Sequence, residues 1–336
     1  MEFFNNHKKL FRTAFLFFAG LTVLVAILPA LNNQNNNRPL PGSAPLSADA
    51  VKGKNVYIAN GCVACHTQQV RNVDMDKVWA PRPGLAADYA DMHRTDFWRN
   101  TATLMGTERT GPDLTDIGNR QPSKDWNLVH LFNPRIVVKE SIMPAYSWLF
   151  EIKNTPSKGD VIVNVPAKYL KGDTGKVVAT KEALQLVAYL LSLKQTKLPD
   201  GTATPGFLYK KEDKQAAGGT ASKELNGVAL YTANCQSCHQ ENGEGLPGAF
   251  PPLKGSKVVT DDNPELMVNI IMNGYSGREK EGFGPMPAVG TMNNLSAEEI
   301  SAIMNHEKST WGNNSKKVSP EEIEKLMEAV KSSAQK

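Results

Sequence analysis

The stretches GCVACHTQ (residues 61–68) and NCQSCHQE (residues 234–241) share the pattern Cys-x-x-Cys-His. The chain has 336 residues and 4 Cys, and every Cys lies in one of these two stretches. A structural zinc site needs four ligands, usually in two closely spaced pairs, whereas these pairs lie about 170 residues apart. A redox dithiol is expected near a pattern of alternating strands and helices, and the sequence shows no such pattern.

Covalent haem attachment accounts for both stretches. The two thiols of such a motif form thioethers with the haem vinyl groups, and the adjacent imidazole becomes the proximal iron ligand. The sequence therefore predicts two covalently bound haem c groups. The predicted attachment residues are Cys62, Cys65 and His66 for the first haem and Cys235, Cys238 and His239 for the second.

Each proximal His leaves one axial position on the iron. A Met in that position favours ferrous iron and raises the reduction potential, which suits an electron carrier. Met143 in SIMPAY and Met286 in GPMPAV each precede a Pro, which stiffens a loop. We predict these two Met residues as the axial ligands, with Met292 as the rival for the second haem. The residues interpreted as ordinary core or surface side chains are Met304, His93, His130 and His306.

Each proximal imidazole also needs a partner for its second ring nitrogen, commonly a backbone carbonyl. The segments TGPDL (110–114) and FPPL (250–253) follow their haem motifs in equivalent places. The carbonyl groups of Pro112 and Pro251 are therefore the predicted partners.

The N-terminal region contains an apolar run. Residues 13–31 carry no charge and, as a helix, span about one hydrocarbon thickness of a bilayer. Lys8, Lys9 and Arg12 precede the run, so the positive-inside rule keeps the N-terminus in the cytoplasm. A cleaved signal peptide is the rival, but its apolar region is usually shorter. We expect a single-pass anchor in a bacterial inner membrane, with the haem domains on the periplasmic side.

The rest of the chain indicates an internal duplication of a small all-α haem domain. A helical run with Gly and, four residues later, Tyr precedes each motif, and an amphipathic helix closes each domain. The one weak strand pattern is DVIVNV (160–165). The expected divisions are 1–31 for the cytoplasmic N-terminus and anchor, 32–50 for a tether, 51–196 for the first haem domain, 197–222 for a linker, 223–315 for the second haem domain and 316–336 for a C-terminal helix or tail.

Charge is distributed unevenly along the chain. The net charge is +4, but residues 51–200 carry about +5 and residues 223–315 about −5. Electron carriers commonly find each other by charge steering, so we predict that the acidic second domain accepts electrons and passes them to the basic first domain. Basic residues are dispersed without an interleaved aromatic stripe, and no nucleic-acid partner is expected.

The first haem domain resembles a known family. GCVACHTQ, GTERTGPDLTDIGNR (106–120) and VHLFNPRIVVKESIMPAYSWL (129–149) are similar to the membrane-anchored monohaem subunit, subunit II, of cbb3-type cytochrome c oxidases. The resemblance covers about residues 1–195 and implies His66 and Met143 as axial ligands, beside a catalytic haem–copper subunit. The second domain is similar to class I cytochrome c domains, including MNHEKSTWGN (304–313). The expected fold is all-α, an N-terminal transmembrane helix followed by two cytochrome c-like haem domains.

Three functions compete. The leading hypothesis is an electron-transfer subunit of a cbb3-type haem–copper terminal oxidase, without an active site of its own. It would relay electrons from a periplasmic donor, either a cytochrome c or a quinol-oxidising complex, to the catalytic subunit for dioxygen reduction, among other oxidase subunits. The alternative is the membrane-anchored cytochrome c subunit of a periplasmic dehydrogenase. A haem-based gas sensor would need an exchangeable sixth ligand and an output module, and the sequence indicates neither.

Overall fold

The structure is a computed structural model. The described residues are 2–36, 38–76, 78–89, 104, 106, 108–170, 172–199 and 225–333. Residues 200–222 of the expected linker and the candidate His93 lie outside the described residues.

The chain divides into two units. The first contains Met1–Pro45, Gly84–Thr103 and Thr196–Thr204, and the second contains Leu46–Pro83, Leu104–Gln195 and Pro205–Lys336. Both Cys-x-x-Cys-His stretches therefore belong to the second unit.

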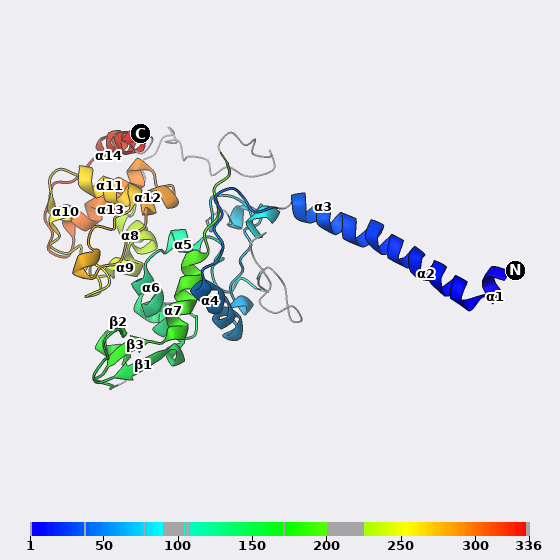
Figure 1. Cartoon of the computed structure of the whole chain (residues 1–336). Coiled ribbons are helices and arrows are strands. Elements are labelled where there is room, and N and C mark those ends of the chain that lie inside the picture. Colours follow the sequence, from blue (N-terminus) through cyan, green and yellow to red (C-terminus); the bar gives the residue numbers. More distant parts are fainter. Residues whose placement is uncertain are drawn as a thin grey trace. The chain divides into compact units, whose positions relative to one another are not determined.

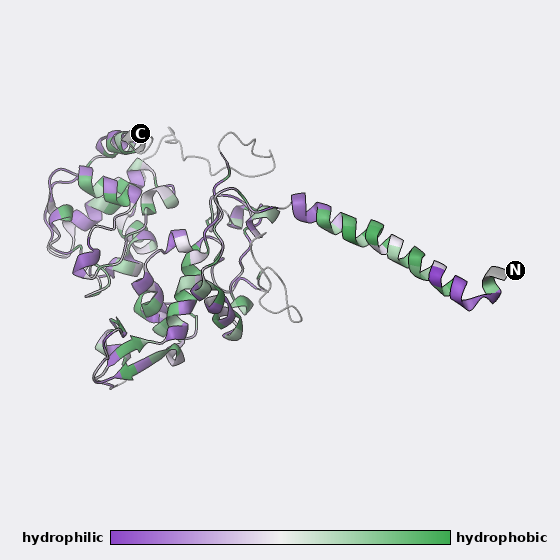
Figure 2. Ribbon diagram, in the orientation of Figure 1, coloured by the Kyte–Doolittle hydropathy of each residue, from purple (hydrophilic) through white to green (hydrophobic). Residues whose placement is uncertain are grey.

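A single helix of 30 residues, His7–Asn36, follows the short helix α1 (Glu2–Asn5). It consists of α2 (His7–Leu21), the π-helical segment η1 (Thr22–Ile27) and α3 (Leu28–Asn36). Pro29 lies just after η1; a Pro lacks the N–H that a regular helix would use, which accounts for the wider turn before it. None of the most apolar part of the helix is buried, and hydrophobic residues run along it (Figure 2). The helix is long and apolar enough to cross a membrane, as the apolar run predicted.

The first haem domain is built on the crossing of α4 (Ala48–Ala59) and α7 (Lys181–Ser192) (Figure 1). The two helices touch at Gly53, where a Cβ atom would lie 1.9 Å from the carbonyl oxygen of Gln185. Tyr57 and Tyr189 pack edge to face beside this point, with ring centroids 5.5 Å apart. Any larger side chain at Gly53 would force the helices apart.

The second haem domain repeats this crossing with α8 (Gly227–Asn234) and α13 (Ala297–Ser309). Gly227 takes the place of Gly53, since a Cβ atom there would lie 2.4 Å from the carbonyl oxygen of Ala302. A capping box begins α13: Ser296 Oγ accepts from Glu299 N at 3.2 Å, and Ser296 N donates to the Glu299 carboxylate at 2.9 Å. The two domains thus share one plan, as the duplicated Gly and Tyr pattern predicted.

Shorter helices complete the two domains. The remaining α-helices are α5 (Ile117–Arg120), α6 (Lys124–Phe132), α9 (Gln236–His239), α10 (Lys257–Thr260), α11 (Glu265–Asn273), α12 (Val289–Met292) and α14 (Pro320–Ser333). The 3-10 segments are η2 (Cys62–Ala64), η3 (Asp74–Asp76), η4 (Ala86–Tyr89), η5 (Pro134–Ile136), η6 (Ser147–Leu149), η7 (Ala167–Tyr169) and η8 (Glu279–Glu281).

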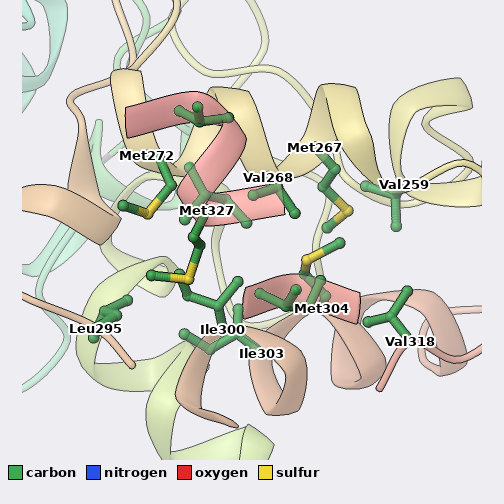
Figure 3. Close-up of a cluster of buried hydrophobic side chains, with 13 residues drawn as sticks. Val259, Met267, Val268, Met272, Leu295, Ile300, Ile303, Met304, Val318 and Met327 are labelled. Carbon is green, nitrogen blue, oxygen red and sulfur yellow. The ribbon is translucent and has the colours of Figure 1, made fainter. Parts of the chain in front are cut away.

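The C-terminal helix α14 belongs to the core of the second domain. Ile323 is fully buried, and Met327 lies in the same cluster as Met272 of α11 and Ile303 of α13 (Figure 3). Ser319 Oγ caps α14 by accepting from Glu322 N at 3.3 Å. The helix was predicted, but the expected boundary at residue 315 separates it from the core that it helps to form.

A small antiparallel sheet lies between α6 and α7 in the chain. Its order is β1-β3-β2, with β1 (Phe150–Lys153), β2 (Val161–Val163) and β3 (Lys176–Ala179). The structure is mostly helical, as predicted, and β2 falls within the strand pattern noted at 160–165. The strands β1 and β3 were not predicted, because runs of only 4 residues carry little alternation.

Candidate haem sites

Each haem motif coils through about one helical turn. In the first, Gly61 adopts φ +69° and η2 follows, with His66 N donating to Cys62 O at 3.0 Å. In the second, His239 N donates to Cys235 O at 3.0 Å across α9. Residues three and four apart on such a turn lie on one face. Both thiols and the imidazole of each motif line a cavity in the structure.

The proximal imidazoles are held by the carbonyl groups that the sequence predicted. His66 Nδ1 lies 2.8 Å from Pro112 O, and His239 Nδ1 lies 2.9 Å from Pro251 O. Because the carbonyl oxygen accepts, Nδ1 carries the proton and Nε2 remains available for a metal. Burial lowers the pKa of both His residues, which favours the neutral ring that ligates iron.

Asp113 connects the loop that contains the Pro112 carbonyl to the first haem motif by hydrogen bonds. Its carboxylate is fully buried and accepts from Thr67 Oγ1 at 2.6 Å, from Gln69 N at 2.8 Å and from Thr115 N at 2.8 Å. A Cβ atom on the neighbouring Gly111 would lie 2.3 Å from the His66 ring. The loop therefore packs so closely against the imidazole that only Gly fits at position 111. Pro112 then supplies the carbonyl group and Asp113 the carboxylate that holds the loop.

In the second domain, Gly245 allows close packing beside the loop that contains the Pro251 carbonyl. Gly245 has φ +63°, and its N–H donates to His239 O at 3.0 Å. A Cβ atom there would lie 2.6 Å from Pro251 O, the acceptor of the proximal imidazole. Tyr231 Oη donates to Gln240 O at 2.6 Å, which ties the end of the motif to α8. The two loops thus reach one His geometry with different residues, Asp113 in the first domain and Gly245 in the second.

Burial changes the pKa of three of the four motif thiols. Burial raises the pKa of Cys62 to about 11 and that of Cys238 to about 11, and it raises the pKa of Cys235 as well. A redox dithiol needs the opposite shift of the thiol pKa. Within the described part of the chain, no group of three or more His, Cys, Asp and Glu side chains could hold a metal ion. The raised thiol pKa values disfavour the redox dithiol alternative.

The two predicted Met ligands lie in loops that other elements hold in place. Met143 lines the cavity with His66, and the following Tyr146 donates its N–H to Leu131 O of α6 at 2.9 Å. Met286 lines the cavity with His239 and forms an isolated bridge with Tyr275, with N···O distances of 2.8 and 3.0 Å. Met292 also lines the cavity, so the second assignment remains a proposal.

The other candidates have structural surroundings. Met304 is fully buried in the core of the second domain, as its helical spacing predicted. The ring of His306 packs against Tyr231 and Trp311, with centroid distances of 5.2 and 5.4 Å. His306 thus belongs to an aromatic cluster and does not line the haem cavity.

Sequence reasoning overlooked two polar residues. His130 was interpreted as an ordinary core or surface residue, yet its Nε2 lies 3.2 Å from Met143 Sδ. Glu307 was not singled out; burial raises its pKa to about 8, and its carboxyl group lies beside the Cys235 thiol. The one sequence signal for His130 was its position four residues after Trp126, on the same helix face.

Helical domains with this arrangement are c-type cytochrome domains, and the chain contains two of them. Each carries a thiol pair and a His bound to a backbone carbonyl in a partly apolar cavity, a set of side chains that fits covalently bound haem c. The family described as "Cytochrome C oxidase, mono-heme subunit/FixO" matches residues 2–186, and the chain belongs to this family. The cytochrome c family matches residues 225–311, the second domain. The chain is therefore a cytochrome c electron-transfer subunit with an additional cytochrome c domain.

Curated relatives are cytochromes of two kinds. Cytochrome c-552 of Thermus thermophilus is 35% identical over 119 residues, covering 32% of this chain and 79% of that protein. The cytochrome c subunit of the quinone alcohol dehydrogenase of Gluconacetobacter polyoxogenes is 32% identical over 151 residues, 42% of this chain and 31% of that protein. The fructose dehydrogenase cytochrome subunit of Gluconobacter japonicus is 32% identical over 111 residues, 32% of this chain and 23% of that protein.

Proposed function

We propose that this chain is the dihaem electron-transfer subunit of a cbb3-type haem–copper oxidase. One observation carries the proposal: the oxidase-subunit family matches residues 2–186, from the N-terminal helix through the first haem domain into α7. The membrane helix and the first cytochrome domain thus match the family together. The second cytochrome domain is an addition at the C-terminal side of this match.

In this function the bound haems supply one-electron redox chemistry, and the protein holds and tunes them. His66 and His239 offer Nε2 to the iron, because Pro112 and Pro251 engage their other ring nitrogen. Met143 and Met286 are the proposed sixth ligands. Their thioethers favour ferrous iron, so both sites would have raised reduction potentials.

The second candidate function is the cytochrome subunit of a quinone-dependent dehydrogenase. The specific observation in its favour is the 32% identity to the alcohol and fructose dehydrogenase subunits. Those matches cover only 31% and 23% of the relatives. Similarity over so small a share of the relatives supports a common cytochrome domain more strongly than membership of the same kind of enzyme complex.

Co-purification from membranes tests the two functions. The full chain, tagged at its C-terminus, should carry with it a multi-span haem–copper subunit and cyanide-sensitive oxygen consumption with reduced cytochrome c. A chain lacking residues 1–36, exported with a cleavable signal peptide, is the matched control for proteins that bind the purification resin non-specifically. Recovery of a dehydrogenase with substrate-driven haem reduction, and no haem–copper subunit, would establish the second candidate.

We also propose that the anchor lies in a bacterial inner membrane with both haem domains in the periplasm. Lys8, Lys9 and Arg12 precede the apolar part of the helix, and c-type haem is attached on the outer face. Protease added to spheroplasts should digest the haem domains while the membrane stays intact. Protection of both domains in that experiment would reverse the proposed orientation.

A further inference from the structure

His130 lies directly against the proposed sulfur ligand of the first haem. It belongs to α6, and its Nε2 is 3.2 Å from Met143 Sδ. Both side chains line the cavity that His66 also lines. The contact joins a helix to a loop 13 residues further along the chain, so it exists only because the fold brings the two together.

The position of His130 is constrained from two sides. Its ring stacks on Trp126, with centroids 4.5 Å apart and an interplanar angle of 11°. Ser123 Oγ caps α6 by accepting from Trp126 N at 3.2 Å. On the other side, Tyr146 N donates to Leu131 O at 2.9 Å, which fixes the Met143 loop to the residue next to His130. The imidazole and the thioether are therefore held at a set distance.

A hydrogen bond between His130 and Met143 can have only one direction, from the imidazole to the sulfur. A thioether sulfur has no proton and can only accept, whereas a neutral imidazole has one N–H to donate. Nδ1 of His130 is buried and has no hydrogen-bond partner among the described residues. The sulfur of Met143 is thus the polar contact that the structure provides for this ring. A thioether has two lone pairs, so one can bind iron while the other accepts from Nε2.

We propose that His130 is a positioning residue for the first haem, donating Nε2–H to Met143 Sδ while that sulfur binds the iron. The hydrogen bond withdraws electron density from the sulfur and makes it a weaker donor to ferric iron. It therefore raises the reduction potential of the first haem and selects one orientation of the Met143 side chain. This inference rests on the proposed role of Met143 as the axial ligand.

The test uses the full chain with both haems and the variants His130→Leu, His130→Gln and Met143→Ala. His130→Leu should lower the potential of one haem component and shift the sulfur-to-iron charge-transfer band of the ferric protein. His130→Gln, whose amide can donate from a similar place, should recover much of both changes and also serves if the Leu variant folds poorly. His306→Leu, a His packed on aromatic rings away from the haem cavity, is the matched control and should leave the first haem unchanged.

The outcomes separate this inference from the ligand assignment beneath it. If Met143→Ala leaves the charge-transfer bands of both haems intact, the ligand assignment is wrong and the inference fails with it. If Met143→Ala removes one band but both His130 variants keep the wild-type potential and band, the ligand stands and the hydrogen bond is refuted. If His130→Leu, and not Met143→Ala, removes low-spin character from the first haem, His130 is itself the ligand and the proposal is overturned.

Discussion

At the scale of single residues, each haem site depends on a few side chains that act through close contact. The predicted proximal ligands His66 and His239 are each oriented by one carbonyl group. Asp113 holds the loop of the first carbonyl group with three hydrogen bonds. A buried carboxylate with several donors is costly to disturb, because each lost bond leaves a desolvated partner. The sites are thus rigid on the proximal side, and the Met side is where substitution should change redox behaviour without unfolding the domain.

The two proposed Met ligands can be tested independently. Met143→Ala and Met286→Ala should each abolish one sulfur-ligated, high-potential component in a redox titration and leave the other in place, because thioether ligation favours ferrous iron. Met304→Leu, in the buried core, is the control and should leave both components. If Met286→Ala changes neither component and Met292→Ala removes one, Met292 is the ligand of the second haem.

Gly53 should be sensitive to any added side chain. Gly53→Val places a branched side chain where even a Cβ atom would lie 1.9 Å from Gln185 O, so we expect a loss of about 1–3 kcal/mol in the free energy of unfolding. Denaturant unfolding followed by circular dichroism measures the loss. Val51→Ala, at a position on α4 that is 43% exposed, should change stability by less than about 0.5 kcal/mol. Equal stability of the two variants would mean that the helices do not cross at Gly53.

At the scale of elements, the two cytochrome domains are variations on one crossed pair of helices. The first domain inserts a three-stranded sheet before its closing helix α7. The second instead adds α14 after its closing helix α13, and Ile323, Met327 and Val330 of α14 join the core. Each addition covers apolar surface that a domain of this small size would otherwise expose. The additions therefore stabilise the domains around an unchanged haem-binding frame.

The helix α14 should contribute substantially to the stability of the second domain. Ile323 is fully buried, so Ile323→Ala should lower the free energy of unfolding by about 2–4 kcal/mol through lost burial and a residual cavity. The neighbouring Glu324 is exposed, and Glu324→Ala is the matched control with an expected change below about 0.5 kcal/mol. Thermal unfolding of the full chain measures both. A negligible effect of Ile323→Ala would show that the helix is a detachable tail.

At the scale of the whole molecule, the chain combines an N-terminal helix with two covalent haem domains of opposite charge. No residue in the most apolar part of this helix is buried. From the charge of about +5 on residues 51–200 and about −5 on residues 223–315 we expect a mutual attraction of the domains, which salt screens beyond roughly 8–10 Å. We therefore expect anchoring and electron transfer to be separable properties.

Removal of the N-terminal helix should release an intact dihaem protein. A chain lacking residues 1–36, exported with a cleavable signal peptide, should be soluble, carry two haems by pyridine haemochrome assay and unfold with a free energy within about 0.5 kcal/mol of the full chain. The reason is that the apolar helix has no buried contacts to lose. Loss of either haem, or aggregation without detergent, would contradict this separation of anchor and haem domains.

Electron transfer between the two haems should depend on ionic strength. We expect the acidic second domain to be reduced first by the donor and to pass its electron to the basic first domain at a rate that falls as salt rises. Stopped-flow reduction at several salt concentrations, followed at wavelengths that distinguish the haems, measures both the order and the rate. The Met143→Ala and Met286→Ala variants assign the signals. A salt-independent rate would mean that the domains stay packed together, and prior reduction of the first haem would reverse the proposed direction.

The sequence by itself determined those features that depend on residues close together in the chain. The haem motifs, the apolar N-terminal helix and the Pro112 and Pro251 carbonyl groups follow from residues a few positions apart or from the Cys-x-x-Cys-His motif itself. The tertiary structure alone decided the rest. His130 meets Met143 through α6 and the loop tied to it, α14 enters a core formed by α11 and α13, and β3 pairs with both β1 and β2. These contacts join segments whose side chains have no distinctive pattern, because packing and desolvation select them only once the chain is folded.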